Sequence, residues 1–128
     1  MSYYISTTFK GTFDEAIQKT TEELKKEGFG VLTEIDVKDT LKKKLDVDFK
    51  KYRILGACNP NMAHKALTTE DKIGTMLPCN VIVEEHEDGT VEISAVDPLA
   101  SMQVVENDDL KTIANQVKKM LTKVIQSL

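Results

Sequence analysis

The stretch "CNVIVEEHEDGTVEISAV", residues 79–96, constrains the fold most, because its apolar residues alternate on both sides of an Asp-Gly pair. A two-residue turn at that pair would mix polar with apolar side chains on both faces of the hairpin. A three-residue loop over 87–89, with its glycine in a bulge, instead pairs Val83 with Ile93. We therefore predict a hairpin in this second register. It also places Val81 opposite Ala95, Glu84 beside Glu92 on the outer face, and Cys79 on the inner face near Asp97.

The rest of the chain alternates between strand and helix patterns. Thr12 and Glu15 have the spacing of a capping box that begins a helix, and Asn107 begins an amphipathic helix of about five turns. The expected strands cover residues 3–9, 29–37 and 52–58, and the expected helices cover 12–27, 38–45, 59–67 and the segment after 107. This order predicts an α+β domain, β-α-β4-α, in which two long helices pack on one face of a five-stranded antiparallel sheet, with short extra helices between strands.

The outer face of this sheet is expected to carry Ile82, Val96 and Leu55, and such an apolar patch often marks a partner or ligand surface. In the second strand, Val31 and Ile35 are expected on one face. Homodimer formation across the outer face or the adjacent edge is our first explanation of the patch. A ligand groove is the second.

Composition limits the possible roles. The chain has 128 residues, enough for one domain over 1–128, with 41% hydrophobic and 30% charged residues. Its formal charge is −4 and its lysines are spread along the chain, so nucleic-acid binding is not expected. No apolar run approaches the roughly 20 residues that span a membrane, and the N-terminus lacks the features of a signal peptide. We expect a cytosolic protein with reduced cysteines.

Chemically, the segment "LGACNPNMAHKAL", residues 55–67, is the most informative. Asn59 and Pro60 form a structural helix start, since Asn caps well and Pro lacks an amide hydrogen that the first turn does not need. If strands three and four are antiparallel neighbours, Cys58 and Cys79 lie at the same end of the sheet. His64 follows a little over one helical turn later, so the three groups can converge.

Two thiols and an imidazole form a soft donor set, which suits zinc or another soft metal. Asp97, water or a group from a second subunit would supply the fourth ligand. The alternative is core packing, in which Cys79 continues the inward row of Val81 and Val83, and Cys58 continues that of Ile54. A pocket for an anion or a polar ligand is a third interpretation.

Other catalytic arrangements have little basis in the sequence. His86 is seven strand residues from Cys79, roughly 23 Å away, so it is interpreted as part of an exposed hairpin end. The carboxylates Glu84, Glu85 and Glu92 are interpreted as surface charge. The one enzyme hypothesis with a residue basis is a Cys58 nucleophile with His64 as its base.

Four segments together resemble a known family: "GFGVLTEIDVKDTL", "YRILGACNPNMAHKAL", "IGTMLPCNVIV" and "DGTVEISAVDP". They are similar to the motifs of the bacterial and archaeal domain of unknown function 302, from about Tyr3 to Leu128. The resemblance implies a TBP-like, helix-grip type α+β domain that is usually a homodimer, with no assigned activity. The positions that match the family pattern are Cys58, Asn59, Pro60, His64, Pro78, Cys79, Asn80, Asp97 and Pro98.

Three functions follow as hypotheses. The first is a homodimeric cytosolic binding module with a soft-metal or reactive-thiol site at Cys58, His64, Cys79 and Asp97. The second is a non-enzymatic dimeric scaffold or small-ligand carrier whose cysteines belong to the core. The third is a cysteine-dependent enzyme.

Overall fold

The computed structural model describes residues 2–128; Met1, with which the predicted domain begins, lies outside them. In this part of the chain, five strands form one antiparallel sheet in the order β1-β5-β4-β3-β2. The strands are β1 (Tyr4–Phe9), β2 (Gly30–Asp36), β3 (Tyr52–Cys58), β4 (Cys79–Glu85) and β5 (Val91–Val96). The helices are α1 (Phe13–Lys26), α2 (Val37–Leu45), α3 (Pro60–Thr69), the 3-10 helix η1 (Asp71–Met76), α4 (Pro98–Ser101) and α5 (Asp108–Gln126).

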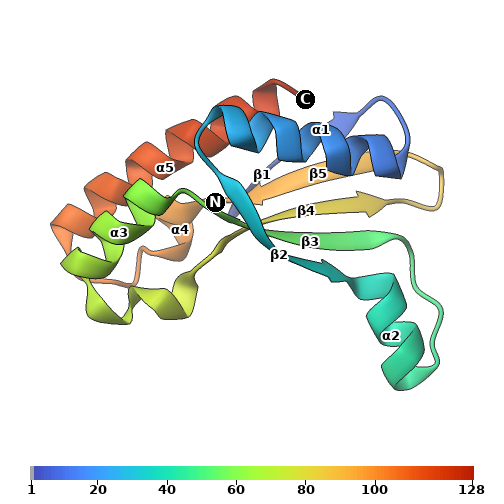
Figure 1. Ribbon diagram of the computed structural model, residues 1–128, viewed down its shortest axis with the longest axis horizontal. Helices are drawn as coiled ribbons and strands as arrows, with labels where there is room; N and C mark the ends of the chain where they lie inside the picture. The colour runs from blue at the N-terminus through green and yellow to red at the C-terminus, as the bar shows by residue number, and fades with distance from the viewer. Residues whose placement is uncertain (1) are drawn as a thin grey trace.

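The two long helices, α1 and α5, cover the same face of the sheet, as predicted (Figure 1). The capping box at the start of α1 is formed: Glu15 N donates to Thr12 Oγ1 over 3.1 Å, and Thr12 N donates to Glu15 Oε1 over 2.9 Å. Leu24 of α1 and Leu121 of α5 are fully buried against the sheet. The apolar stripes read from the sequence therefore form the main core.

The hairpin has the predicted register. Val83 lies opposite Ile93, and Glu84 lies opposite Glu92. His86 N donates to Thr90 O over 2.8 Å, which closes the three-residue loop, and Gly89 has a φ of 87° that few other residues adopt. The alternation of apolar residues was sufficient to determine this pairing.

Two predictions about sheet faces are wrong. A bulge between Val31 and Thr33 shifts the register of β2, so Val31 faces the core while Ile35 is 47% exposed on the outer face. Leu55 lies opposite Val81 and is fully buried, so it belongs to the inner face. The outer face keeps Ile82 and Val96 among its apolar residues.

Helix α2 forms where the sequence predicted it but buries no residue. It projects below the sheet, beyond the ends of β2 and β3 and on the side away from α1 and α5 (Figure 1). Leu45 and Phe49, in and just after α2, are 66% and 38% exposed. No helix of residues 2–128 has both the length and the apolar character needed to cross a membrane.

Candidate functional site

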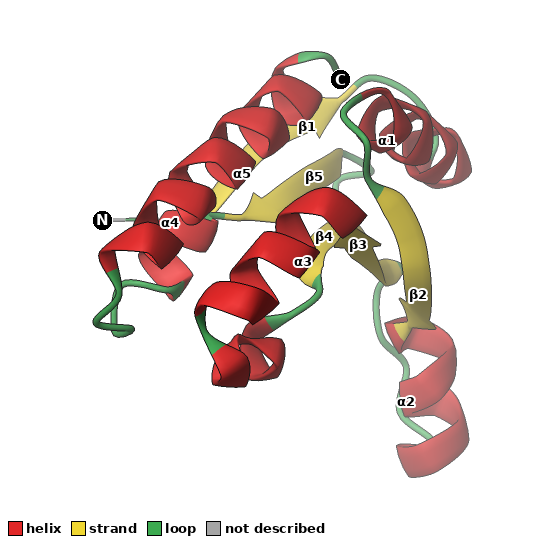
Figure 2. Ribbon diagram, turned by 60° about the vertical axis from the view of Figure 1, so that its left-hand side comes forward, coloured by secondary structure: helices red, strands yellow, loops and turns green. Residues whose placement is uncertain are grey.

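A mostly apolar pocket of about 310 Å³ lies between α3, α5 and the sheet end at which β3 finishes and β4 begins. Figure 2 shows α3 and α5 side by side in front of this end of the sheet. The pocket opens where two hydrophobic clusters meet, the main core and a smaller one that includes Ala66 and Met102. The side chains of Ala63, Ala66 and Ala114 line it, and they are too short to fill the space between the helices.

Both cysteines line this pocket and neither is in a disulfide. Cys79 is 8% exposed, and it lies opposite Ala57 in the sheet, so Cys58 is one residue beyond the pair. The prediction that both cysteines belong to inward-facing rows is wrong for Cys58, because Ile54, whose row it continues, lies opposite Ile82 on the outer face. Cys58 is half-buried at the end of β3. The two cysteines still meet at one end of the sheet, as the sequence predicted.

Burial raises the pKa of the Cys79 thiol from 9.0 to about 11, and the nearby Cys58 adds a smaller electrostatic contribution. At neutral pH, Cys79 is therefore a protonated thiol with little nucleophilic character. Its role in the free protein is that of a small apolar surface in the pocket wall.

His64 and Asp97 do not join the cysteines. Helix α3 begins at Pro60, and its packing against α5 turns one side toward the pocket while His64 is exposed. The residues of α3 that line the pocket are Met62, Ala63, Ala66 and Leu67. The Asp97 carboxylate caps α4, accepting from Leu99 N over 3.0 Å, and pairs with Lys118 Nζ at 2.9 Å. Of the four predicted ligands, the structure thus brings two to the pocket, and it gives Cys58 no histidine base there.

Asn59 has the predicted structural role. Its Oδ1 accepts a hydrogen bond from Met62 N over 3.3 Å, which caps α3, and Pro60 occupies the first turn. Its Nδ2 donates to Glu27 O over 3.2 Å, just after α1. Although Asn59 lines the pocket, its amide is already hydrogen-bonded, and no charged side chain is among the lining residues that the structure describes.

A second group of ligand-type side chains was missed by the sequence reasoning. Glu84, His86 and Glu92 lie on the outer face near the hairpin, with one ligand atom from each within 4.8 Å of the others. The predicted register already set Glu84 beside Glu92, and two-residue periodicity places His86 on the same face as Glu84. The interpretation of His86 as part of an exposed hairpin end does not take this periodicity into account.

The model of the family "Domain of unknown function DUF302" matches residues 5–128. The chain is also similar to the crystal structure of an uncharacterised conserved DUF302 protein from Bacillus stearothermophilus, with 30% sequence identity, a TM-score of 0.92 and 98% of each chain covered. A search of functionally curated proteins finds no match.

Proposed function

Since this chain belongs to the DUF302 family, whose description assigns no function, we propose a function from its own geometry: a cytosolic binding module for a small, neutral, predominantly apolar ligand. The pocket between α3, α5 and the sheet is the observation that carries this proposal. Its volume of about 310 Å³ is within the range of small-molecule sites, roughly 300–1,000 Å³. The unpaired state of Cys58 and Cys79 agrees with a reducing compartment.

The lining of the pocket determines the class of ligand. An ionic group entering it would lose its hydration, and among the described lining residues no side chain carries a compensating charge. Asn59 is already bonded to Met62 and Glu27, and the Cys79 thiol stays protonated. A neutral ligand with mostly apolar surface is therefore favoured over an anion or a polar metabolite.

Access to the pocket is supported by its rim. Leu32 and Leu67 line it and yet are 69% and 43% exposed. Leu32 lies in the β2 bulge, which turns its side chain away from the regular row of the strand. A ligand at this entrance would cover apolar surface that is now in contact with water.

The test uses a neutral environment-sensitive dye, N-phenyl-1-naphthylamine, titrated into the purified protein. We expect saturable fluorescence enhancement that Ala63→Phe abolishes, because the new ring fills the pocket. Ala100→Phe is the matched control, since Ala100 is half-buried on α4 and does not line the pocket. The proposal is wrong if the native protein does not enhance the fluorescence, or if Ala63→Phe binds the dye as well as Ala100→Phe does.

A second candidate function, soft-metal binding, has one observation in its favour. Four sulfur side chains line the same pocket: Cys58, Cys79, Met62 and Met102. Thiolates and thioethers select Cu(I), and the N-terminus of α3 beside Cys58 would stabilise the negative charge that remains after both thiols lose their protons. In this metal site Met62 would be a ligand instead of the predicted His64, and Met102 would be a ligand instead of the predicted Asp97.

Metal content after purification in chelator-free buffer, and competition with a chromogenic Cu(I) chelator, test this candidate. Cys58→Ser and Cys79→Ser are expected to lose the metal, whereas His64→Ala and Asp97→Asn are expected to keep it. A metal-free native protein that does not compete for Cu(I) would contradict it. Metal retained in both cysteine variants would do so as well.

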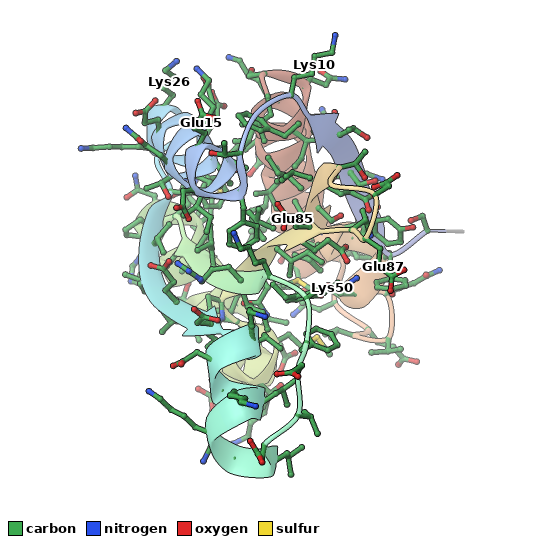
Figure 3. All side chains as sticks on the ribbon, turned by 90° about the vertical axis from the view of Figure 1, so that its right-hand side faces the viewer. Lys10, Glu15, Lys26, Lys50, Glu85 and Glu87 are labelled. Carbon is green, nitrogen blue, oxygen red and sulfur yellow. The ribbon has the colours of Figure 1, made fainter. Side chains whose placement is uncertain are left out.

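We also propose that the module is a homodimer in which the second copy covers the outer sheet face and contacts α2. That face carries Ile82 and Val96, and no helix of residues 2–128 covers it. Helix α2 contacts β2 and β3 but buries no residue, and a helix of nine residues is barely stable alone in water, so a partner over its exposed Leu45 would stabilise it. Opposite charges support a second copy as that partner. Helix α2 has four lysines and one aspartate, while the hairpin end carries Glu85, Glu87 and Asp88. Figure 3 labels Glu85 and Glu87.

A further inference from the structure

At the hairpin end of the outer face, far from the thiol pocket, two carboxylates and an imidazole lie together. Glu84 and Glu92 are directly opposite each other on β4 and β5. His86 follows Glu84 by two residues, and its Nε2 is 2.9 Å from Glu92 Oε1. The three ligand atoms lie within 4.8 Å of one another.

The three side chains of this group are partly buried and not freely solvated. The side chain of Glu84 is only 14% exposed, and those of Glu92 and His86 are 32% and 38% exposed. Like charges placed directly opposite each other on adjacent strands destabilise a sheet unless a cation offsets them. Lys50 supplies one such cation, because its Nζ lies 2.6 Å from Glu84 Oε1. The pair of carboxylates thus already holds a positive charge.

We propose that Glu84, His86 and Glu92 form a binding site for a divalent metal ion with a preference for oxygen and nitrogen ligands, of which Mn²⁺ is the representative. Carboxylates suit Mn²⁺ and imidazole is a common ligand of divalent transition metals. With metal–ligand bonds of about 2.1 Å, neighbouring ligands of an octahedral ion are about 3 Å apart. The separation of His86 Nε2 and Glu92 Oε1 already meets this distance.

Two requirements remain. The proton that His86 Nε2 shares with Glu92 must move to the other ring nitrogen or to solvent, so that the Nε2 lone pair is free for the metal, and Glu84 must exchange the ammonium group of Lys50 for the metal. Lys50 is in the loop before β3, and its side chain is 35% exposed, so it can leave Glu84 and be hydrated. Water molecules, or groups of the second copy proposed to cover the outer face, would complete the coordination of the ion, because three protein ligands leave further positions open. In the single chain the site is thus a surface site with a built-in competing cation.

The experiment measures Mn²⁺ binding by the loss of the electron paramagnetic resonance signal of the free aqueous ion. Mn²⁺ is chosen because the thiols Cys58 and Cys79 compete poorly for it. We expect one ion bound per chain in the native protein. His86→Ala and Glu92→Gln should weaken binding about tenfold or more, and Lys50→Met should strengthen it.

His64→Ala and Glu87→Gln are the matched controls, because they remove an exposed histidine and an exposed carboxylate outside the site and should leave the binding constant unchanged. His86→Asn serves as a second, smaller change in case His86→Ala alters the hairpin. Absence of saturable binding at millimolar Mn²⁺ would overturn the proposal. Equal weakening by Glu87→Gln and Glu92→Gln would also overturn it, since it would show attraction by general acidity only.

Discussion

Ala57, and not Cys58, lies opposite Cys79 in the pairing of β3 with β4. This offset of one residue leaves Cys79 8% exposed while Cys58 is half-buried at the end of its strand. The two thiols share a pocket but differ in burial, so their chemistry is expected to differ as well.

The first prediction concerns thiol reactivity. A rise of the Cys79 pKa from 9.0 to about 11 lowers its thiolate fraction near neutral pH about a hundredfold, because each pKa unit is a factor of ten. Iodoacetamide should therefore label the Cys58→Ser protein, which retains only Cys79, on the order of a hundred times more slowly than it labels a free cysteine peptide. Mass spectrometry gives the rates. Labelling at the rate of the free peptide would show that Cys79 is not buried in solution. In the native protein, His64→Ala should change the labelling rate of neither cysteine.

Stability at alkaline pH is the second prediction. The folded-state pKa of Cys79 is raised, so the unfolded state releases the thiol proton first as pH increases. The contribution of Cys79 to the free energy of unfolding is complete below about pH 9 and is lost up to about pH 11, with a limit of roughly 2–3 kcal/mol. The free energies of unfolding of the native protein and of Cys79→Ala, measured with urea, should converge as the pH rises through this interval. The difference in the free energy of unfolding between the native protein and Cys58→Ala should change less over the same interval. If the difference between the native protein and Cys79→Ala stayed constant with pH, the raised pKa of Cys79 would be contradicted.

Gly56 provides the third prediction. A Cβ atom there would overlap Thr33 Oγ1 and approach Pro78 Cγ to 2.8 Å. Gly56→Ala should therefore lower the free energy of unfolding by about 1–3 kcal/mol. Gly30→Ala is the matched control, because a Cβ at Gly30, in the neighbouring strand, meets nothing within 4 Å. Equal urea midpoints for the two variants would mean that Thr33 and Pro78 adjust without cost.

The fourth prediction tests the homodimer by analytical ultracentrifugation. Ile82→Asp places a charge in the middle of the outer face, and Leu45→Asp places one on α2, so both should shift the protein toward monomer. Val104→Asp should not, although Val104 is 79% exposed, because it lies between α4 and α5. A native protein that sediments as a monomer, or an Ile82→Asp variant that remains a dimer, would refute the outer-face interface.

Local patterns in the sequence were sufficient for most of the fold. The hairpin register followed from alternation, because a slip of one residue would have turned Val83 and Ile93 toward solvent. The start of α3 followed from Asn59 and Pro60. The bulge in β2 was not predictable, since nothing in "GVLTEID" requires an extra residue in the pairing, and it reversed the expected position of Ile35.

The candidate site was predictable in its location but not in its composition. Antiparallel neighbours at one sheet end brought Cys58 and Cys79 together. The direction of His64 depended on the rotation of α3 about its own axis, which is set by packing against α5 rather than by spacing. The pocket itself results from short side chains on two helices distant in sequence, such as Ala63 and Ala114, and no local pattern reports such a gap.

The hydrogen bonds of Asn59 fix one end of the helix that borders the pocket. One side-chain amide joins the start of α3 to Glu27 at the end of α1, and its Nδ2 also lies 3.8 Å from Met120 Sδ of α5. This end of α3 is therefore anchored. The other end is anchored as well, because Asn107 Nδ2 donates to Thr69 O over 3.2 Å, so a ligand would enter past the exposed Leu32 and Leu67 along a helix that is held at both ends.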